Sequence, residues 1–177
     1  MTGITIREAR EDELDAAGAL VVRAYAGNGT PDGRHAQYAE YLDHVRDARG
    51  RSRHCPILVA VESGGDAGAD LGGILLGCVS YVPDAASPYA ELEVDGEAGF
   101  RMLGVDPAAQ GRGVGQALVE ACISRARAAG RRGLAISTGP DMVAAHRLYE
   151  RLGFRRAPAR DFEPVPGIGL WAYVLVL

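Results

Sequence analysis

The sequence predicts an α/β fold of the α+β kind, in which a central mixed β-sheet of about six to seven strands is flanked by about four helices. Apolar runs of strand length alternate with amphipathic stretches along the chain. The helix expected from Val114 to Gly130 lies between two strands, so it forms a right-handed crossover joining parallel neighbours. The runs Ile57 to Val61 and Leu71 to Val82 flank a turn rich in Gly and Asp, which predicts an antiparallel hairpin.

Length and composition limit the class of protein. A chain of 177 residues is the usual size of one domain, so we expect a single domain over residues 1–177. A net charge of −4 argues against a nucleic-acid-binding module, which normally carries a basic surplus. No charged-then-apolar leader opens the chain and no apolar run reaches the ~18 residues of a membrane span. The three widely spaced cysteines suggest neither a disulfide framework nor a metal site. We therefore expect a cytoplasmic protein with reduced thiols, no membrane partner and no nucleic-acid partner.

The first third of the chain predicts one strand and two helices. Residues 4–6 alternate apolar and polar side chains as an opening strand does. A first helix follows, with apolar residues at three- and four-residue steps and a stop at Gly27 to Pro31. Residues 34–49 are polar with Tyr38, Tyr41 and nearby apolar residues on about one side, which predicts a second helix. His35, His44 and His54 lack the spacing of metal ligands, so we expect no metal.

The remaining elements surround a glycine-rich stretch. Ala98 to Val105 predicts a strand that ends at Asp106-Pro107, and Leu134 to Thr138 predicts the next strand. A helix starting at Pro140-Asp141 places Met142, Ala145, Tyr149 and Leu152 on one face. The final strand runs from Ile168 to Leu177.

The stretch Gln110 to Leu118 predicts an anion-binding cradle. Its three glycines at alternate positions let backbone N–H groups point into one concavity and let a ligand approach the chain. The following helix adds unpaired N–H groups and the positive end of its dipole. The dinucleotide pattern Gly-x-Gly-x-x-Gly fails here, because its third position holds Gln116 in one register and Leu118 in the other. A Gly-Lys-Ser/Thr sequence and a Gly-x-Ser-x-Gly elbow are both missing from the chain.

Two patterns together resemble the GNAT superfamily of acyl-CoA-dependent N-acyltransferases. Gln110-x-x-Gly113-x-Gly115 matches the family's Arg/Gln-x-x-Gly-x-Gly/Ala cradle. Ala145-x-x-x-Tyr149-x-x-x-Gly153-Phe154 is similar to the family's later helix and its Gly-Phe exit. The resemblance is close over residues 97–156, which it identifies as an acetyl-CoA-binding core, and looser over the rest. It implies a single N-acetyltransferase domain that uses acetyl-CoA as co-substrate and no metal.

The resemblance also implies which residues bind acetyl-CoA. The backbone from Gly111 to Gln116 should bind the coenzyme A pyrophosphate, and the strand that precedes the cradle should pair with the pantetheine arm. The cofactor-binding residues are then Leu103, Gly104, Val105, Gln110, Gly111, Arg112, Gly113, Val114, Gly115, Gln116, Ala145 and Tyr149. One departure is Met142, because many members of the family have an asparagine there that contacts the pantetheine.

Two catalytic residues follow from the same resemblance. Tyr149 would donate its phenolic proton or a hydrogen bond to the coenzyme A sulfur, the alternative being a buried tyrosine that only packs. Glu97 resembles in position the carboxylate that many relatives use as a general base, and partial burial would raise its pKa. Its alternative is a solvated charge at a strand edge, and Glu91 or Glu93 could replace it. We expect His146 to lie on the surface, and the thioester oxygen to be polarised by a backbone N–H near Val105.

The expected function is acetyl transfer from acetyl-CoA to a primary amine. The alternative is a non-catalytic acyl-CoA-binding or regulatory module that kept the cradle. The acceptor stays open among a small-molecule amine, an amino acid, an antibiotic and a protein N-terminus, and the oligomeric state between a monomer and a homodimer. By resemblance, the acceptor is held by residues 25–54 and 160–167, which are the least patterned parts of the sequence.

Overall fold

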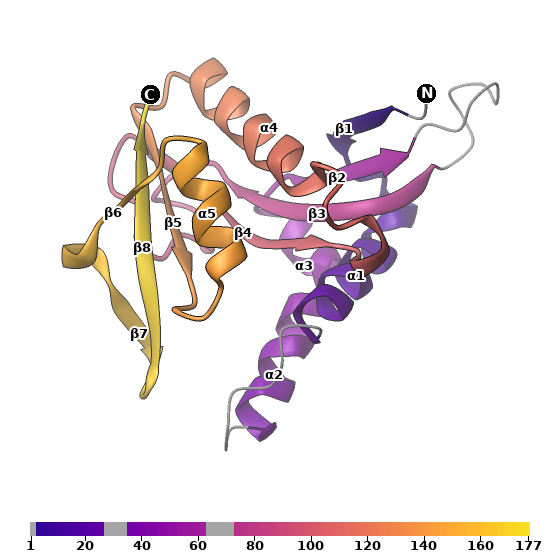
Figure 1. Ribbon diagram of the computed structural model, residues 1–177, viewed down its shortest axis with the longest axis horizontal. Helices are drawn as coiled ribbons and strands as arrows, with labels where there is room; N and C mark the ends of the chain where they lie inside the picture. Colours follow the sequence, from indigo (N-terminus) through magenta and orange to yellow (C-terminus); the bar gives the residue numbers. More distant parts are fainter. Residues whose placement is uncertain (1–2, 27–34, 63–72) are drawn as a thin grey trace. The chain divides into compact units, whose positions relative to one another are not determined.

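The computed structural model describes residues 3–26, 35–62 and 73–177 (Figure 1). Its elements form two compact units, one of residues 1–80 and 102–119 and the other of residues 81–101 and 120–177. Strand β4 (Glu97–Val105) contributes its first five residues to the second unit and its last four to the first. The single domain expected over residues 1–177 stays a prediction.

The first unit contains three antiparallel strands. They are β1 (Ile4–Glu8), β2 (Ile57–Glu62) and β3 (Ile74–Val82), whose last two residues belong to the second unit. Strand β2 pairs with β1 on one side and with β3 on the other, in the order β1-β2-β3-β4. The expected hairpin is therefore confirmed, while its turn lies outside the described residues. All residues of β2 except the last are buried, which is why its sequence reads as a continuous apolar run.

Helices pack against these strands in the first unit. They are α1 (Leu14–Ala26), α2 (His35–Arg46), α3 (Ala48–Ser52) and the first residues of α4 (Val114–Ala128), with a 3-10 turn η1 (Glu11–Glu13) before α1. The apolar face of α1 enters the core beside β2, which buries Leu14, Ala17, Leu20, Val21, Val45, Ile57, Val59, Val61, Cys78 and Met102. The apolar periodicity of the sequence therefore correctly predicted which face of α1 is buried. Its expected stop at residues 27–31 lies outside the described part of the chain.

The single helix expected over residues 34–49 is two helices, so that prediction was wrong. Asp47 lies between α2 and α3, and its side chain accepts a hydrogen bond from the Gly50 N–H at 2.7 Å. This contact caps a new helix start and competes with continuation of the preceding helix. Helices α2 and α3 both pack against α1.

The second unit holds the rest of the mixed sheet. Its elements are β5 (Gly133–Thr138), α5 (Val143–Arg151), β6 (Arg155–Arg156), a 3-10 turn η3 (Pro158–Arg160), β7 (Phe162–Val165) and β8 (Ile168–Val176). Strand β4 pairs with β5 in parallel, as the crossover predicted, and β8 pairs with β5, β6 and β7 in antiparallel fashion. The described residues thus form eight strands and five α-helices, slightly more than the six to seven strands and four helices expected.

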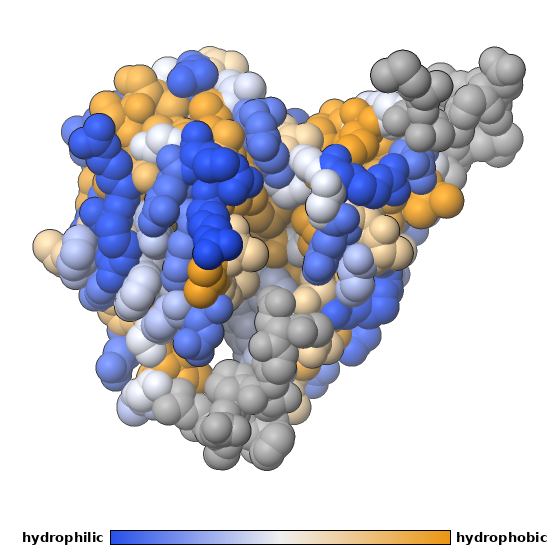
Figure 2. All heavy atoms as spheres, viewed as in Figure 1, coloured by the Kyte–Doolittle hydropathy of each residue, from blue (hydrophilic) through white to orange (hydrophobic). Residues whose placement is uncertain are grey.

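Helix α5 has one buried and one solvent-facing side. Figure 2 shows hydrophilic side chains on its outward face and an apolar patch at its N-terminal end, where Val143 is 51% exposed. The opposite face buries His146 and Tyr149, at 7% and 5% exposure. His146 was expected on the surface and that prediction was wrong, because it lies one turn before Tyr149 on the same face. None of the described helices is long and apolar enough to cross a membrane.

Candidate active site

The first unit contains an open glycine cradle at the start of α4. The Asp106 side chain caps a short turn, η2 (Pro107–Ala109), by accepting from the Ala108 N–H at 3.0 Å. Gly111 and Gly113 follow with φ of +77° and +80°, values that side-chain-bearing residues rarely adopt. A Cβ at either position would meet no atom within 4 Å. Both glycines therefore border open space directly before the unpaired N–H groups of a helix start, as an anion site requires.

The cradle is held close to strand β3. A Cβ on Gly77 would stand 2.8 Å from Val114 Cγ1 and 3.0 Å from the Gly104 carbonyl oxygen. Only glycine allows α4 and β4 to approach β3 so closely, and Val114 is buried as a result. Gly77 was not among the expected site residues. An isolated glycine inside an apolar strand was the signal that could have indicated it.

Ion pairs fix both ends of the cradle. Arg23 pairs with Asp106 at 3.1 Å, and Asp106 also receives the hydrogen bond from Ala108. These contacts, Ala108 first, lower the pKa of the Asp106 carboxyl. Arg112, expected to bind the cofactor, places Nη2 2.5 Å from Glu62 Oε1 at the end of β2. The positive charge of Arg112 is therefore already paired with Glu62. The groups of the cradle that are left to bind an anion are its backbone N–H groups.

The end of β4 leads into the cradle with one irregular residue. Met102 has φ of +53°, a left-handed value that costs a non-glycine residue about 1 kcal/mol or more. Such a residue interrupts a regular ladder, as in a β-bulge. Beyond it Leu103 and Val105 are half-buried, while Gly104 is buried against Val21 and Ala24 of α1. The expected pantetheine-pairing residues thus form the strand end directly before the cradle.

In the second unit, Tyr149 lies in an aromatic cluster. Its ring centroid is 5.7 Å from Phe100, 5.8 Å from Phe154 and 6.1 Å from Tyr173. Its hydroxyl has no hydrogen-bond partner among the described residues. Burial, reinforced by the neighbouring Cys122, strongly raises the pKa of Tyr149. The phenol therefore keeps its proton throughout the physiological range.

The surroundings of Glu97 differ from those expected of a base. Its two oxygens accept from Arg160 Nη1 at 3.1 Å and Nη2 at 2.7 Å, and Oε2 also accepts from the Val94 N–H. Burial by itself raises the pKa of Glu97, but these hydrogen bonds and the charges of Arg160 and Arg132 outweigh it, so the pKa lies below the usual value. The raised pKa expected from partial burial was wrong. Arg160 lies 63 residues away, so sequence reasoning had no signal for this pair.

Three further residues lie on helix α5 or directly before it. Ala145 is half-buried on α5, and Met142 caps that helix without a side-chain hydrogen bond. His146 is stacked on Trp171 at 5.3 Å and on Tyr173 at 5.5 Å, and its Nε2–H donates to the Gly139 carbonyl at 2.9 Å. It therefore tethers the loop before α5. Within the part of the chain that the structure describes, no group of His, Cys, Asp and Glu side chains could hold a metal ion.

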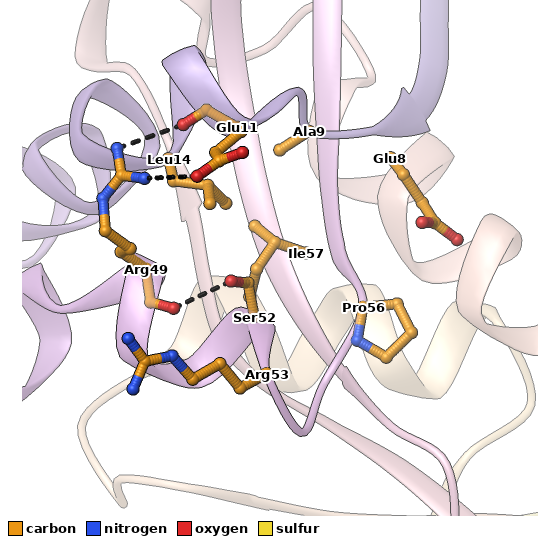
Figure 3. A pocket seen from close by; sticks show the side chains of 9 residues that line it. All are labelled: Glu8, Ala9, Glu11, Leu14, Arg49, Ser52, Arg53, Pro56 and Ile57. Atoms are coloured by element: carbon orange, nitrogen blue, oxygen red, sulfur yellow. Dashed lines mark hydrogen bonds and ion pairs between the residues drawn. The ribbon is translucent and has the colours of Figure 1, made fainter.

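A separate pocket of about 380 Å³ lies in the first unit (Figure 3). Its polar groups already bind one another. Arg49 Nη2 donates to the Glu11 carbonyl at 3.1 Å, and the Ser52 hydroxyl donates to the Arg49 carbonyl at 2.8 Å. Arg49, Ser52 and Arg53 of its lining fall in the range expected to hold the acceptor, but none of the expected catalytic or cofactor-binding residues lines this pocket. The cradle of the first unit and the Tyr149 cluster of the second unit are therefore each a better candidate for a functional site than this pocket.

The sequence of this chain is similar to those of known proteins. Residues 20–154 match the model of the acetyltransferase (GNAT) family. A mycothiol acetyltransferase from Beutenbergia cavernae is 34% identical over 145 residues, which are 81% of this chain and 42% of that protein. One from Gordonia bronchialis is 47% identical over 55 residues, which are 31% of this chain and 18% of that protein. The chain thus spans less than half the length of these curated relatives.

Solved structures share the fold. A GCN5-related N-acetyltransferase from Kribbella flavida aligns with a TM-score of 0.65 at 23% identity and covers 98% of both chains. The yncA protein of Salmonella typhimurium, solved with its cofactor acetyl-CoA, aligns with a TM-score of 0.60 at 22% identity over 98% of this chain and 94% of its own.

Proposed function

The chain belongs to the acetyltransferase (GNAT) family, and from this premise we propose that it transfers an acetyl group from acetyl-CoA directly to a primary amine. The observation that carries the proposal is the open cradle, in which Gly111 and Gly113 take left-handed φ values at the start of α4. The chain covers 42% or less of the length of these relatives, so their names do not identify its acceptor. The acceptor class is a small-molecule amine or a protein N-terminus.

The cradle has the task of binding the pyrophosphate of acetyl-CoA. Backbone N–H groups of residues 111–116 point their dipoles at an anion without the entropy cost of ordering long side chains. The open space beside Gly111 and Gly113 fits a group that must approach the backbone closely. Leu103, Gly104 and Val105 bind the pantetheine arm through their backbone, and Gln110, Arg112 and Ala145 border the bound cofactor.

Tyr149 has the task of stabilising the departing thiolate. In the reaction the amine nitrogen attacks the thioester carbon, the C–S bond breaks, the nitrogen loses a proton and the sulfur gains one. An ordinary thiol has a pKa of about 8.5, and burial holds the pKa of Tyr149 far above that value. Complete transfer of the phenolic proton is therefore uphill. Donation of a strong hydrogen bond to the developing negative charge is the task that this tyrosine suits.

Glu97 suits a structural task better than proton abstraction. Both of its oxygens are engaged by Arg160, and its pKa is lowered. A carboxylate so bound is a poor proton acceptor, and we assign it to anchoring the start of β4. The amine then loses its proton to another group or to solvent, because positioning of the reactants supplies much of the rate enhancement.

The three cysteines of the chain are buried and none of them forms a disulfide among the described residues, which supports a reducing, cytoplasmic compartment. A homodimer remains compatible with the proposal, which requires no partner subunit.

The test combines binding and turnover. At 100 times its dissociation constant, acetyl-CoA should stabilise the protein by ~2.7 kcal/mol, which raises Tm by roughly 5 to 11 °C for a chain of this size. Free coenzyme A thiol should then appear only when an amine is added. Stabilisation without thiol release on any amine of a broad panel would identify an acyl-CoA-binding module instead. Absence of both effects would remove acetyl-CoA as the ligand.

A further inference from the structure

Strands β4 and β5 stop pairing soon after they begin. Their parallel register covers two residue pairs, Glu97 with Gly133 and Ala98 with Leu134. Just past these pairs, a Cβ on Gly99 of β4 would stand 2.0 Å from Glu93 Oε1 and 2.5 Å from the Ala135 carbonyl oxygen of β5. The carboxylate of Glu93 therefore reaches between the two strands where their pairing ends, and Gly99 is the residue that leaves room for it.

Glu93 is the centre of a preorganised polar cluster, which also contains Glu91, Arg101 and Ser137. Its Oε2 accepts from the backbone N–H of Glu91 at 2.8 Å and of Leu92 at 3.1 Å. Arg101 Nη2 lies 3.5 Å from the same oxygen. The Glu93 side chain is 0% exposed and that of Arg101 is 10% exposed. These contacts fix the segment that carries Glu91.

Glu91 is the accessible member of the cluster. Its Oε2 is bound by Arg101 Nη1 and accepts from the Ser137 hydroxyl of β5 at 3.3 Å. Its side chain is 37% exposed. Its second oxygen, Oε1, has no partner among the described residues. A carboxylate held by two donors through one oxygen, with its second oxygen unpaired on a partly exposed side chain, is preorganised to bind a further donor.

The cluster has surplus acceptors. Glu93 Oε1 is buried and has no hydrogen-bond partner in the described chain, a costly arrangement for a carboxylate oxygen. The nitrogens of Arg101 are all engaged, since Nε donates to the Tyr89 carbonyl at 2.5 Å and the other two bind the carboxylates. Two carboxylates share this one guanidinium. The complementary ligand is a cation with several N–H donors and no acceptor, which describes a primary ammonium group.

We propose that Glu91 binds the ammonium group of the acceptor amine, and that Arg101 and Glu93 are positioning residues for it. The inference rests on the proposed function and names its substrate class. The acceptor is a cationic primary amine without a carboxylate beside its amino group, because the guanidinium of Arg101 is only 10% exposed and its single positive charge is already shared by two carboxylates. A free α-amino acid would place its own negative charge against Glu91.

The variant Glu91→Gln tests the role of the charge while it keeps the size of the side chain. Its KM for the amine should rise about tenfold or more, as hydrogen bonds to a charged group imply. Its KM for acetyl-CoA and its Tm should stay at the wild-type values. Glu91→Asp should recover part of the amine affinity. Glu11→Gln, at a carboxylate that is 90% exposed in the other unit, is the matched control and should behave as wild type.

The substrate preference is tested with two matched pairs. Tyramine should be acetylated with a higher kcat/KM than L-tyrosine, and L-alaninamide with a higher kcat/KM than L-alanine. Loss of the carboxylate changes amine basicity in opposite directions in the two pairs, so basicity alone cannot produce the same preference in both. An unchanged amine KM in Glu91→Gln, or equal use of the amino acids, would overturn the inference and leave the proposed function intact.

Calorimetric titration of tyramine into the wild type and Glu91→Gln separates the inference from the proposed function. If the wild type transfers no acetyl group to any amine, the proposed function fails. Tyramine binding that depends on Glu91 then still supports the ammonium site, and the absence of such binding overturns it.

Discussion

Replacement of Tyr149 by phenylalanine removes one oxygen and keeps the ring. The ring contacts with Phe100, Phe154 and Tyr173 are all between 5.7 and 6.1 Å and should persist. Because the hydroxyl has no partner among the described residues, its loss should change the free energy of unfolding by less than about 1 kcal/mol. Any large loss of activity in Tyr149→Phe would therefore belong to the reaction and not to the fold.

The size of that loss follows from the task we assign to the hydroxyl. Removal of one preorganised donor from a developing negative charge lowers kcat by about 10²- to 10³-fold, or roughly 3 to 4 kcal/mol of barrier. KM for acetyl-CoA should change little, because the cradle supplies the binding. Since burial raises the pKa of Tyr149, the wild-type kcat should show no loss from this group as the pH rises from about 7 to 9, below the ordinary tyrosine value near 10.

The measurement is thiol release at saturating acetyl-CoA and amine, with Tyr173→Phe as the matched control. Tyr173 is 2% exposed and belongs to the same cluster, but its hydroxyl contacts Glu150 at 3.4 Å. The control should keep kcat within about threefold of wild type, as expected for the loss of one weak hydrogen bond. Equal turnover in both variants and the wild type would refute the role of Tyr149 and leave it as a packing residue.

Three further substitutions test the cradle, the acid stability and the gap between the strands. Gly113→Ala should cost about 1 to 2 kcal/mol of stability, because alanine is strained at φ of +80°, and its methyl group should raise KM for acetyl-CoA in steady-state assays. The hydrogen bond from Arg7 lowers the pKa of Glu13 to about 2. This carboxylate therefore stabilises the fold at neutral pH, and its contribution disappears as the pH falls from about 5 to below 2. In urea titrations the wild type should lose about 3 kcal/mol more than Glu13→Gln over that window. Gly99→Ala would place its methyl group 2.0 Å from a buried carboxylate oxygen, so Tm should fall by an amount that corresponds to about 1 to 3 kcal/mol. Gly169→Ala, where a Cβ meets no atom within 4 Å, is the control for both glycine variants, and an equal effect there would contradict both predictions.

Local patterns in the sequence predicted the local features of the fold. The apolar periodicity of residues 14–24 placed α1 on the correct face, and the glycines at 111 and 113 were expected at a tight turn and do take positive φ. The family resemblance built on that turn and on Tyr149 is confirmed by the match over residues 20–154. The burial of His146 could also have been predicted, because it lies three residues before Tyr149 on the same helical face.

Features that depend on pairing between distant segments could not be predicted in this way. Strands β6 and β7 are two and four residues long, include arginines and a proline, and exist because β8 pairs with them. No local pattern indicates such strands, since their hydrogen-bond partners lie elsewhere in the chain. The pairing of Glu97 with Arg160 likewise joins segments that are distant in the sequence. Because this pairing engages both oxygens of Glu97, that carboxylate has no free oxygen with which to bind a ligand.

Three carboxylates within seven residues illustrate why position in the sequence is a poor guide to role. Glu97 is held by Arg160 through both oxygens, and Glu93 is enclosed between β4 and β5. Glu91 shares Arg101 with Glu93 and keeps one oxygen free at the surface. The resemblance to relatives indicated the first of the three, because it lies at the start of the strand. The arginines that bind each carboxylate leave the third as the group that can meet a cationic acceptor.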